Sequence, residues 1–267
     1  MPDSTPDSTP DPTPDPAPDP TPDLAPDLAS GPTPDAPLSA SVIGATGLVG
    51  RHLVRMLLGD GRFGPIRTFQ RRPSGVRVGD REAEEHMVDF DQLDAWGARL
   101  GADVLFSALG TTRRAAGGQE AQYRVDHDYQ VEAARHAAAA GTRVLVLVSS
   151  VGADPASRNF YLRMKGQVEE AVTALPFESV HLLRPGILDG DRDEVRLGER
   201  LGLRVARGLA RLGAPARLRP IHASVVARAM LCVAVSPVGP RVSRHEAADL
   251  FALGRLPPTG SGPERVS

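Results

Sequence analysis

Apolar residues alternate along the chain between short continuous runs and longer stretches with helical spacing. The continuous runs predict β-strands at residues 38–43, 66–70, 86–88, 103–110, 143–148 and 180–184. The helical spacing predicts helices directly after the first strand and over residues 119–140, 158–174, 222–235 and 244–252. Strands that alternate with helices are typical of a parallel sheet with right-handed crossovers. We therefore expect an α/β fold: one doubly wound Rossmann-type parallel sheet of six or seven strands, with helices on both faces and a small C-terminal lobe on the substrate side.

Proline and aspartate dominate the start of the chain: residues 1–37 hold 13 prolines, 8 aspartates and neither lysine nor arginine. Proline opposes helix formation and the apolar content is too low to drive folding, so we expect a disordered acidic tail. It lacks the basic start and apolar core of a signal peptide. A solubility role, or a decoy for a basic site, competes with a low-complexity extension without function, which the composition favours. The predicted domain spans residues 38–255, and residues 256–267 form a flexible end.

The predicted domain carries most of the positive charge. The whole chain has a net charge of −2; without the tail's 8 acids, 31 basic and 25 acidic residues remain, a net charge of +6. No apolar run approaches the ~20 residues of a membrane-spanning helix. The single cysteine, Cys232, excludes an internal disulfide, is interpreted as a small core residue, and favours a cytoplasmic location. The seven histidines show no metal-ligand spacing, so we expect no metal site, and we expect no nucleic-acid partner.

Three glycines, Gly44, Gly47 and Gly50, close the first predicted strand and open the helix after it. Glycines at such a turn let the backbone approach a pyrophosphate, whose charge is stabilised by the free N–H groups of the helix N-terminus. An ordinary glycine-rich turn is the alternative. The pattern favours a dinucleotide-binding site.

Two arginines, Arg71 and Arg72, end the second predicted strand, where a dinucleotide fold meets the adenosine ribose. An acid at this place binds the ribose 2′-hydroxyl of NAD, whereas arginine accommodates the 2′-phosphate of NADP. With no acid beside them, these arginines favour NADP(H), with NAD(H) left open. Two solvated loop arginines are the alternative.

The most specific catalytic pattern is Tyr161 and Lys165, which lie four residues apart on one face of a predicted helix. A lysine ammonium there favours ionisation of the phenol and can hold the cofactor ribose, so the tyrosine can exchange a proton with a substrate oxygen. Ser149 and Ser150, at the end of the preceding strand, can orient that oxygen. Lys165 is the only lysine beside 30 arginines, which argues against a chance pair of surface residues.

Arginines also gather late in the chain: residues 192–219 hold 8 arginines against 3 acids. Five of them, Arg196, Arg200, Arg204, Arg207 and Arg211, form one helical stripe. A solvated helix face is the favoured interpretation. An anionic substrate, a cofactor phosphate or peripheral contact with a membrane surface is the alternative.

Taken together, these motifs resemble the atypical short-chain dehydrogenase/reductases, and more narrowly the Tat-interacting NADPH-binding oxidoreductases, which are related to NAD-dependent epimerases. The resemblance covers about residues 40–235. Besides the glycine turn and Tyr161 to Gly166, it rests on the runs Leu109-Gly110-Thr111-Thr112-Arg113, Val125-Asp126-His127-Asp128-Tyr129, Ser149-Ser150-Val151-Gly152-Ala153-Asp154 and Arg184-Pro185-Gly186-Ile187-Leu188, followed by Asp191-Arg192.

The resemblance implies a set of residues that contact NADPH: Gly44, Ala45, Thr46, Gly47, Leu48, Val49, Gly50, Arg71, Arg72, Leu109, Gly110, Tyr161, Lys165, Leu188, and Arg192 or Arg196. One position departs from the wider pattern. Asp126 stands where many short-chain enzymes keep an asparagine that supports a proton-relay water.

The sequence therefore predicts an NADP(H)-dependent oxidoreductase that acts on a small carbonyl or alcohol substrate, with Tyr161, Lys165 and Ser150 or Ser149 as its catalytic residues. A non-catalytic NADPH-sensing regulator is the alternative, and a nucleotide-sugar epimerase is disfavoured by the short C-terminal lobe. We also expect a symmetric homodimer through the helices at 119–140 and 158–174, because Val168, Ala171, Val172 and Leu175 give the second helix a surplus of apolar residues. Coverage of the sheet by the same stripe is the other interpretation.

Overall fold

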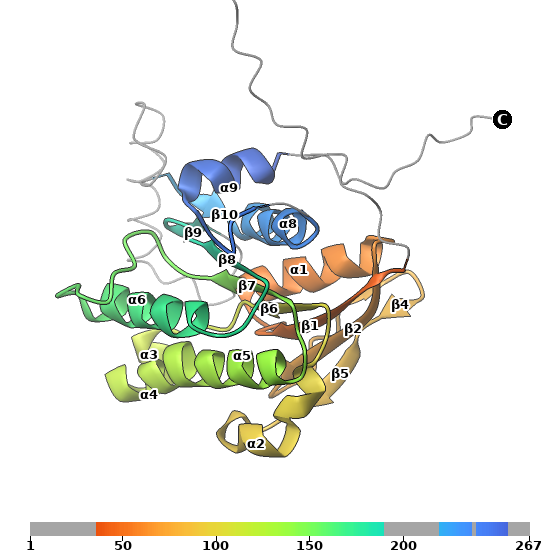
Figure 1. Ribbon diagram of the computed structural model, residues 1–267, viewed down its shortest axis with the longest axis horizontal. Helices are drawn as coiled ribbons and strands as arrows, with labels where there is room; N and C mark the ends of the chain where they lie inside the picture. Colours follow the sequence, from red (N-terminus) through yellow and green to blue (C-terminus); the bar gives the residue numbers. More distant parts are fainter. Residues whose placement is uncertain (1–35, 190–218, 237–238, 256–267) are drawn as a thin grey trace, which may run out of the picture. The chain divides into compact units, whose positions relative to one another are not determined.

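The computed structural model describes residues 36–189, 219–236 and 239–255, and its centre is a seven-stranded sheet (Figure 1). The strand order is β11-β8-β7-β6-β1-β2-β5, and every pair of neighbours is parallel. The strands are β1 Leu38–Ile43, β2 Phe63–Gln70, β5 Glu84–Met87, β6 Val104–Ser107, β7 Val144–Val148, β8 Ser179–Leu183 and β11 Val242–His245. The chain order reverses between β1 and β6. This is the switch point at which open α/β sheets bind ligands.

Helices cover both faces of the sheet, as predicted (Figure 1). On one face lie α1 (Leu48–Gly59), α8 (Ala223–Ala234) and α9 (Ala247–Leu253); on the other lie α2 (Leu93–Trp96), α5 (Tyr129–Ala139) and α6 (Phe160–Thr173). The smaller elements are β3 Arg77–Val78, β4 Arg81–Glu82, η1 Phe90–Gln92, η2 Gly97–Leu100, α3 Arg113–Ala116, α4 Gln119–Tyr123, η3 Arg124–Asp128, β9 Leu188–Asp189 and β10 Ile221–His222.

The two faces of the sheet have separate apolar cores. Val42, Phe106 and Val146 face the side of α1 and α8, whereas Ile43, Leu105 and other side chains face α5 and α6. Central strands that are buried on both faces need almost no polar residues, which is why β7 reads Val-Leu-Val-Leu-Val. The predicted α/β fold is confirmed, and its C-terminal strand edge carries the loops that form the candidate site.

Two elements differ from the sequence-based expectation. The seventh strand, β11, occupies part of the span predicted as a helix at 244–252, and α9 begins only at Ala247. The predicted helix at 119–140 is present, but its middle is a π-turn, η3, between α4 and α5. A π-turn widens the helix by one residue and is frequent at functional sites.

The predicted homodimer stays a prediction. Val168 and Val172 are fully buried within this chain against the sheet, so they serve the alternative role of covering it. The arginine stripe at 196–211, Arg192 and nearly all of the acidic tail lie outside the described residues. In the described part of the chain, no helix is long and apolar enough to span a membrane.

Candidate cofactor and active site

The glycine turn joins β1 to α1 by close backbone contacts that no side chain could share. Gly44 has a φ of +83°, and a Cβ built on it would lie 2.4 Å from the backbone carbon of Ala108. A Cβ on Gly50 would lie 2.1 Å from the carbonyl oxygen of Gly44. The first glycine thus brings the ends of β1 and β6 together, and the third seats α1 on the strand end. Both roles are those of glycines in a dinucleotide-binding turn.

The N-terminus of α1 is left without a side-chain cap. Its N-cap residue is Gly47, and no acid lies in the first turn. By contrast, Asn159 caps α6 and His222 caps α8 through their side chains. The first N–H groups of α1, at Leu48 and Val49, therefore face the switch point with the positive end of the helix dipole. An uncapped end of this kind fits a phosphate.

Arg71 and Arg72 follow β2 directly, at the same edge of the sheet, and both are exposed. Neither forms an ion pair or side-chain hydrogen bond with another residue in the described parts of the chain. Two exposed guanidinium groups at the end of β2, the strand next to β1, fit a second phosphate, since arginine binds phosphate through paired donors.

Tyr161 and Lys165 lie one turn apart at the start of α6, but in different surroundings. The Tyr161 side chain is 38% exposed, whereas Lys165 is almost completely buried. The helix is held against the preceding loop at Gly166, where a Cβ would lie 2.2 Å from the backbone nitrogen of Pro155. The structure therefore has an accessible phenol one helical turn from a buried ammonium group, on the helix that follows β7.

Lys165 forms a buried ion pair with Asp126 of η3. Its Nζ lies 3.3 Å from Asp126 Oδ1, and the two side chains are 4% and 2% exposed. The other carboxylate oxygen, Oδ2, accepts a hydrogen bond of 2.8 Å from the backbone N–H of Thr111 in the loop after β6. Burial raises the pKa of Asp126, and the nearby Lys165 opposes that shift. Asp126 thus joins the predicted catalytic helix to a predicted cofactor loop.

Asp126 stands out in the sequence only as a departure from the wider short-chain pattern and is not among the predicted site residues. A signal was available: Gln122, Asp126 and Gln130 recur every fourth residue on one side of an otherwise apolar helix face, and all three are buried. Buried polar side chains need partners, so such a stripe indicates a hydrogen-bonded network.

The two candidate serines have different partners. Ser149 is buried and its Oγ donates a hydrogen bond of 2.5 Å to Glu169 Oε1. Glu169 in turn accepts two hydrogen bonds from Arg184, of 2.9 and 2.6 Å. Ser150 is only half-buried, and its Oγ makes a long local contact of 3.3 Å with the carbonyl of Val151. Ser150 is therefore the serine free to contact a substrate.

The remaining predicted residues divide between the same edge and the undescribed segment. Leu109 and Gly110 lie in the loop after β6, and a Cβ on Gly110 would approach Asp126 Oδ1 to 3.2 Å. Leu188 lies in β9, which pairs with β10. Arg192 and Arg196 lie outside the described residues. Within the described residues, no three His, Cys, Asp or Glu side chains are placed to hold a metal ion.

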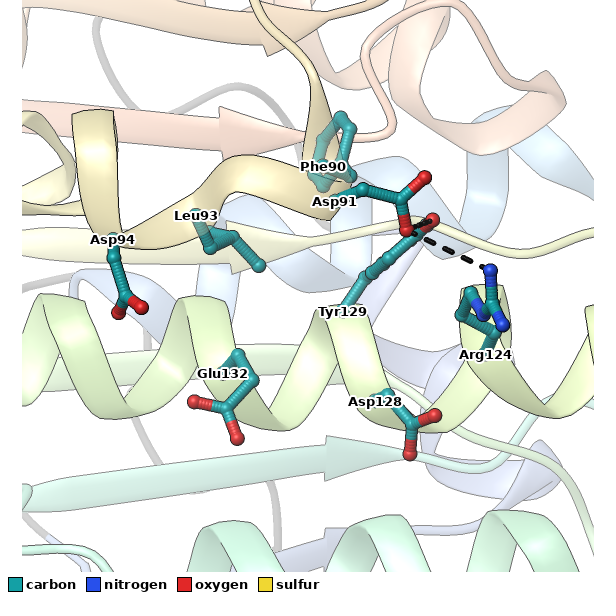
Figure 2. Close-up of a pocket in the computed structure, with 8 residues that line it drawn as sticks. All are labelled: Phe90, Asp91, Leu93, Asp94, Arg124, Asp128, Tyr129 and Glu132. Atoms are coloured by element: carbon teal, nitrogen blue, oxygen red, sulfur yellow. Dashed lines mark hydrogen bonds and ion pairs between the residues drawn. The ribbon is translucent and has the colours of Figure 1, made fainter.

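A separate cavity of about 280 Å³ lies between α2 and α5 (Figure 2). Its lining comprises Phe90, Asp91, Leu93, Asp94, Arg124, Asp128, Tyr129 and Glu132, and includes none of the predicted cofactor or catalytic residues. Tyr129 donates a hydrogen bond of 2.6 Å to Asp91 across it (Figure 2). The burial of Tyr129, and then this hydrogen bond, raise the pKa of Tyr129 to about 12.

Comparison with known proteins agrees with this geometry. Residues 44–208, more than half of the chain, match the family model described as NAD(P)H-binding. The chain belongs to this family. It is 42% identical to the mitochondrial protein fmp52 of Aspergillus fumigatus over 177 residues, 64% of this chain and 75% of the relative. It is 34% identical to the mitochondrial protein FMP52 of Eremothecium gossypii over 223 residues, 81% of this chain and 97% of the relative.

Solved structures show the same fold. A short-chain dehydrogenase/reductase superfamily protein from Agrobacterium tumefaciens, with NAD bound, has a TM-score of 0.57 and 18% sequence identity, covering 80% of this chain and 81% of the other. This likeness shows the predicted Rossmann-type fold, and the family model agrees with the predicted dinucleotide-binding turn.

The expected cytoplasmic location is contradicted by these relatives, which are named as mitochondrial proteins. The expectation rested on the single cysteine, Cys232. A low cysteine count argues only against an oxidising compartment, and it does not distinguish one reducing compartment from another.

Proposed function

We propose that the protein is an NADP(H)-dependent oxidoreductase of the short-chain reductase type, acting on a small carbonyl or alcohol. The observation that carries this proposal is the exposed Tyr161 one helical turn from the buried, unique Lys165. A chance surface lysine would stay in solvent, because a buried ammonium group is costly unless it is paired; Lys165 is buried together with a carboxylate partner, Asp126. The family supplies the cofactor class, and the side chains supply the chemistry.

In reduction, NADPH would supply the hydride to the carbonyl carbon of the substrate. Tyr161 donates its phenolic proton to the carbonyl oxygen, and the resulting phenolate is stabilised by Lys165 and by the N-terminal end of α6, in whose first turn Tyr161 lies. The Ser150 hydroxyl donates a hydrogen bond to the same oxygen and fixes its position. Oxidation of an alcohol is the reverse, with the phenolate accepting the proton.

For the cofactor, we propose that the uncapped N-terminus of α1 binds the pyrophosphate and that Arg71 and Arg72 bind the 2′-phosphate. NADPH then binds more tightly than NADH. Replacing both arginines by alanine removes charge-assisted hydrogen bonds worth about 1.5–3 kcal/mol each. We expect NADPH affinity to fall at least ~10-fold in fluorescence titrations, with NADH affinity nearly unchanged. Arg135→Ala/Arg143→Ala, which removes two exposed arginines from other surfaces, is the control. Equal affinities for both cofactors in the unmodified protein would contradict the proposed preference.

The reaction itself is tested by NADPH oxidation with a panel of aldehydes, ketones and quinones. Tyr161→Phe should abolish turnover and leave NADPH binding nearly intact, because the ring packs but the oxygen moves the proton. Parental rates in Tyr161→Phe would refute the mechanism. If the unmodified protein binds NADPH tightly but does not oxidise it with any of the substrates tested, a cofactor-sensing role replaces the enzymatic one.

A further inference from the structure

Four buried polar side chains form one connected network behind Tyr161: Ser107, Asp126, Gln130 and Lys165. All four are at most 3% exposed. Ser107 Oγ donates to Gln130 Oε1 at 2.7 Å, and Gln130 Nε2 donates to the backbone carbonyl of Asp126 at 2.6 Å. Buried polar networks with every member satisfied are rigid. This one fixes the backbone of Asp126 to the end of β6.

The network fixes the Asp126 side chain as well. Its carboxylate has two partners, Thr111 N–H at 2.8 Å and Lys165 Nζ at 3.3 Å, and a Cβ on Gly110 would crowd it at 3.2 Å. The backbone of Asp126 lies in the π-turn, where the N–H of Tyr129 bonds to the carbonyl of Arg124, five residues back. The carboxylate therefore has little freedom to turn away from the lysine.

Charge explains why a carboxylate occupies this place. A buried lysine without a counter-ion tends to lose its proton, by shifts of up to 3–5 pH units in fully buried cases. An asparagine at position 126 could accept the Thr111 hydrogen bond but could not balance the ammonium charge. Asp126 can do both.

We propose that Asp126 is a positioning residue for this reaction: its carboxylate keeps Lys165 protonated and holds it in register with the loop that follows β6. The proposal rests on the proposed function for its catalytic part. A protonated lysine stabilises the developing phenolate of Tyr161. The Asp126 carboxylate also fixes the position of the loop predicted to contact the cofactor, through its hydrogen bond from the Thr111 N–H. Asp126 acts through Lys165 and Thr111 and is not itself a proton donor to substrate.

Other charged groups lie on the elements around this pair. They are Arg113 and Arg114 of α3, Glu120 of α4, Arg124, His127 and Asp128 of η3, Glu132, Arg135 and His136 of α5, Asp154 and Arg158 in the loop before α6, Arg163, Glu169 and Glu170 on α6, and Asp189 on β9. His127 interacts with Asp128 at 2.8 Å, and Arg163 donates to the carbonyls of Ser157 and Arg158. Most are exposed, so solvent screens them. All stay constant when only residue 126 changes, so they do not contribute to the difference measured.

The unique lysine makes a direct test feasible. Protein grown with lysine labelled with ¹³C at Cε gives one lysine signal by NMR, and its shift with pH reports the charge of Lys165. We expect the lysine to lose its proton at least about two pH units lower in Asp126→Asn than in the unmodified protein. Asp128→Asn, on the same turn but exposed, is the matched control and should leave the titration unchanged.

The rate should follow the charge. In Asp126→Asn, NADPH oxidation should fall over the same pH range in which the lysine signal titrates, while the unmodified enzyme shows no fall there. Asp126→Glu keeps the charge and should keep the lysine protonated.

The proposal is overturned if Lys165 loses its proton at the same pH in Asp126→Asn as in the unmodified protein, whatever the rate of that variant. If that variant does not fold, a native lysine that loses its proton at lower pH than in the urea-unfolded parent overturns it instead. A parent inert toward every carbonyl defeats the proposed function alone, and the NMR result still decides whether Asp126 holds the charge.

Discussion

Helix α6 carries two buried charges one turn apart, Lys165 and Glu169, and the fold neutralises them in different ways. Lys165 has one carboxylate partner, Asp126 at 3.3 Å. Glu169 accepts two hydrogen bonds from Arg184 and one from Ser149, and Arg244 approaches it to 3.6 Å. Lys165 lies one helical turn from the accessible phenol of Tyr161. Glu169 lies in a crowded junction of β7, β8 and α6.

This difference assigns a structural role to the Glu169–Arg184 pair and a role in the proposed chemistry to the Asp126–Lys165 pair. Arginine stays protonated at any accessible pH, so the Glu169–Arg184 pair is permanent and its donors and acceptors are used up. Lysine can change its charge with its surroundings, so the Asp126–Lys165 pair can be tuned. A chain that uses arginine at every other basic position keeps lysine where an adjustable charge is needed.

The largest effect should come from breaking the permanent pair. Glu169→Gln removes the carboxylate that accepts two hydrogen bonds from the partly buried Arg184 and leaves that arginine only the half-exposed Glu246, at 3.1 Å. Breaking a buried pair costs about 3–5 kcal/mol, which is the upper bound of the expected loss. Urea denaturation should show this loss of unfolding free energy. Exposed Glu170, the next residue, is the control, and Glu170→Gln should lie within about 0.5 kcal/mol of the parent. If Glu169→Gln is as stable as Glu170→Gln, the contacts of Glu169 with Arg184 and Ser149 do not stabilise the fold.

A second effect, of roughly 3 kcal/mol at most, should come from pH at the neighbouring edge of the sheet. His181 of β8 lies 3.1 Å from His245 of β11, ring nitrogen to ring nitrogen, and burial together with His245 lowers the pKa of His181 to about 4. Because the unfolded histidine has a pKa near 6.5, the unfolded state binds more protons below that pH. Stability should therefore be constant above pH 6.5 and fall as the pH drops toward 4.

The measurement is the unfolding free energy between pH 7 and 4.5, with His181→Asn as the comparison. That variant should be less stable at pH 7 and should show a shallower decline. His245 and His52, whose pKa values are also lowered by burial, leave some pH dependence in the variant. Parallel declines in the two proteins would assign the effect to other groups.

The sequence predicted most of the fold because central strands must be apolar on both faces. The run from Val144 to Val148 has almost no other interpretation. The edge strand β11 escaped prediction because it pairs only with β8 and needs no second buried face. Its residues, Val242-Ser243-Arg244-His245, contain a single large apolar side chain. Periodicity predicts two-sided burial well and edge strands poorly.

The part of the candidate site that depends on local spacing was predictable from the sequence. The part that depends on contacts between distant residues was not. Tyr161 and Lys165 follow from spacing on a single helix. The assignment of Ser149 to Glu169, and of Asp126 to Lys165, depends on contacts between residues 20 and 39 positions apart in the sequence. The π-turn that carries Asp126 has no local sequence signal of the kind that glycine or proline gives to other turns.

The smallest effect should come from replacing Ser149 or Ser150. The comparison tests whether the Glu169 region of α6 is structural and the Lys165 region is catalytic. Ser149→Ala removes a hydrogen bond to a charged group, worth about 1.5–3 kcal/mol, so it should lower stability and leave the rate within about twofold. Ser150→Ala should do the reverse, because its hydroxyl has no strong partner in the fold and is needed only to orient the substrate oxygen. Urea denaturation and NADPH oxidation, measured on the same two variants, make each the control for the other. If Ser149→Ala loses the rate and Ser150→Ala does not, the serine next to Glu169 is the catalytic one. The junction with Arg184 would then belong to the chemistry, and the division between the two buried charges would fail.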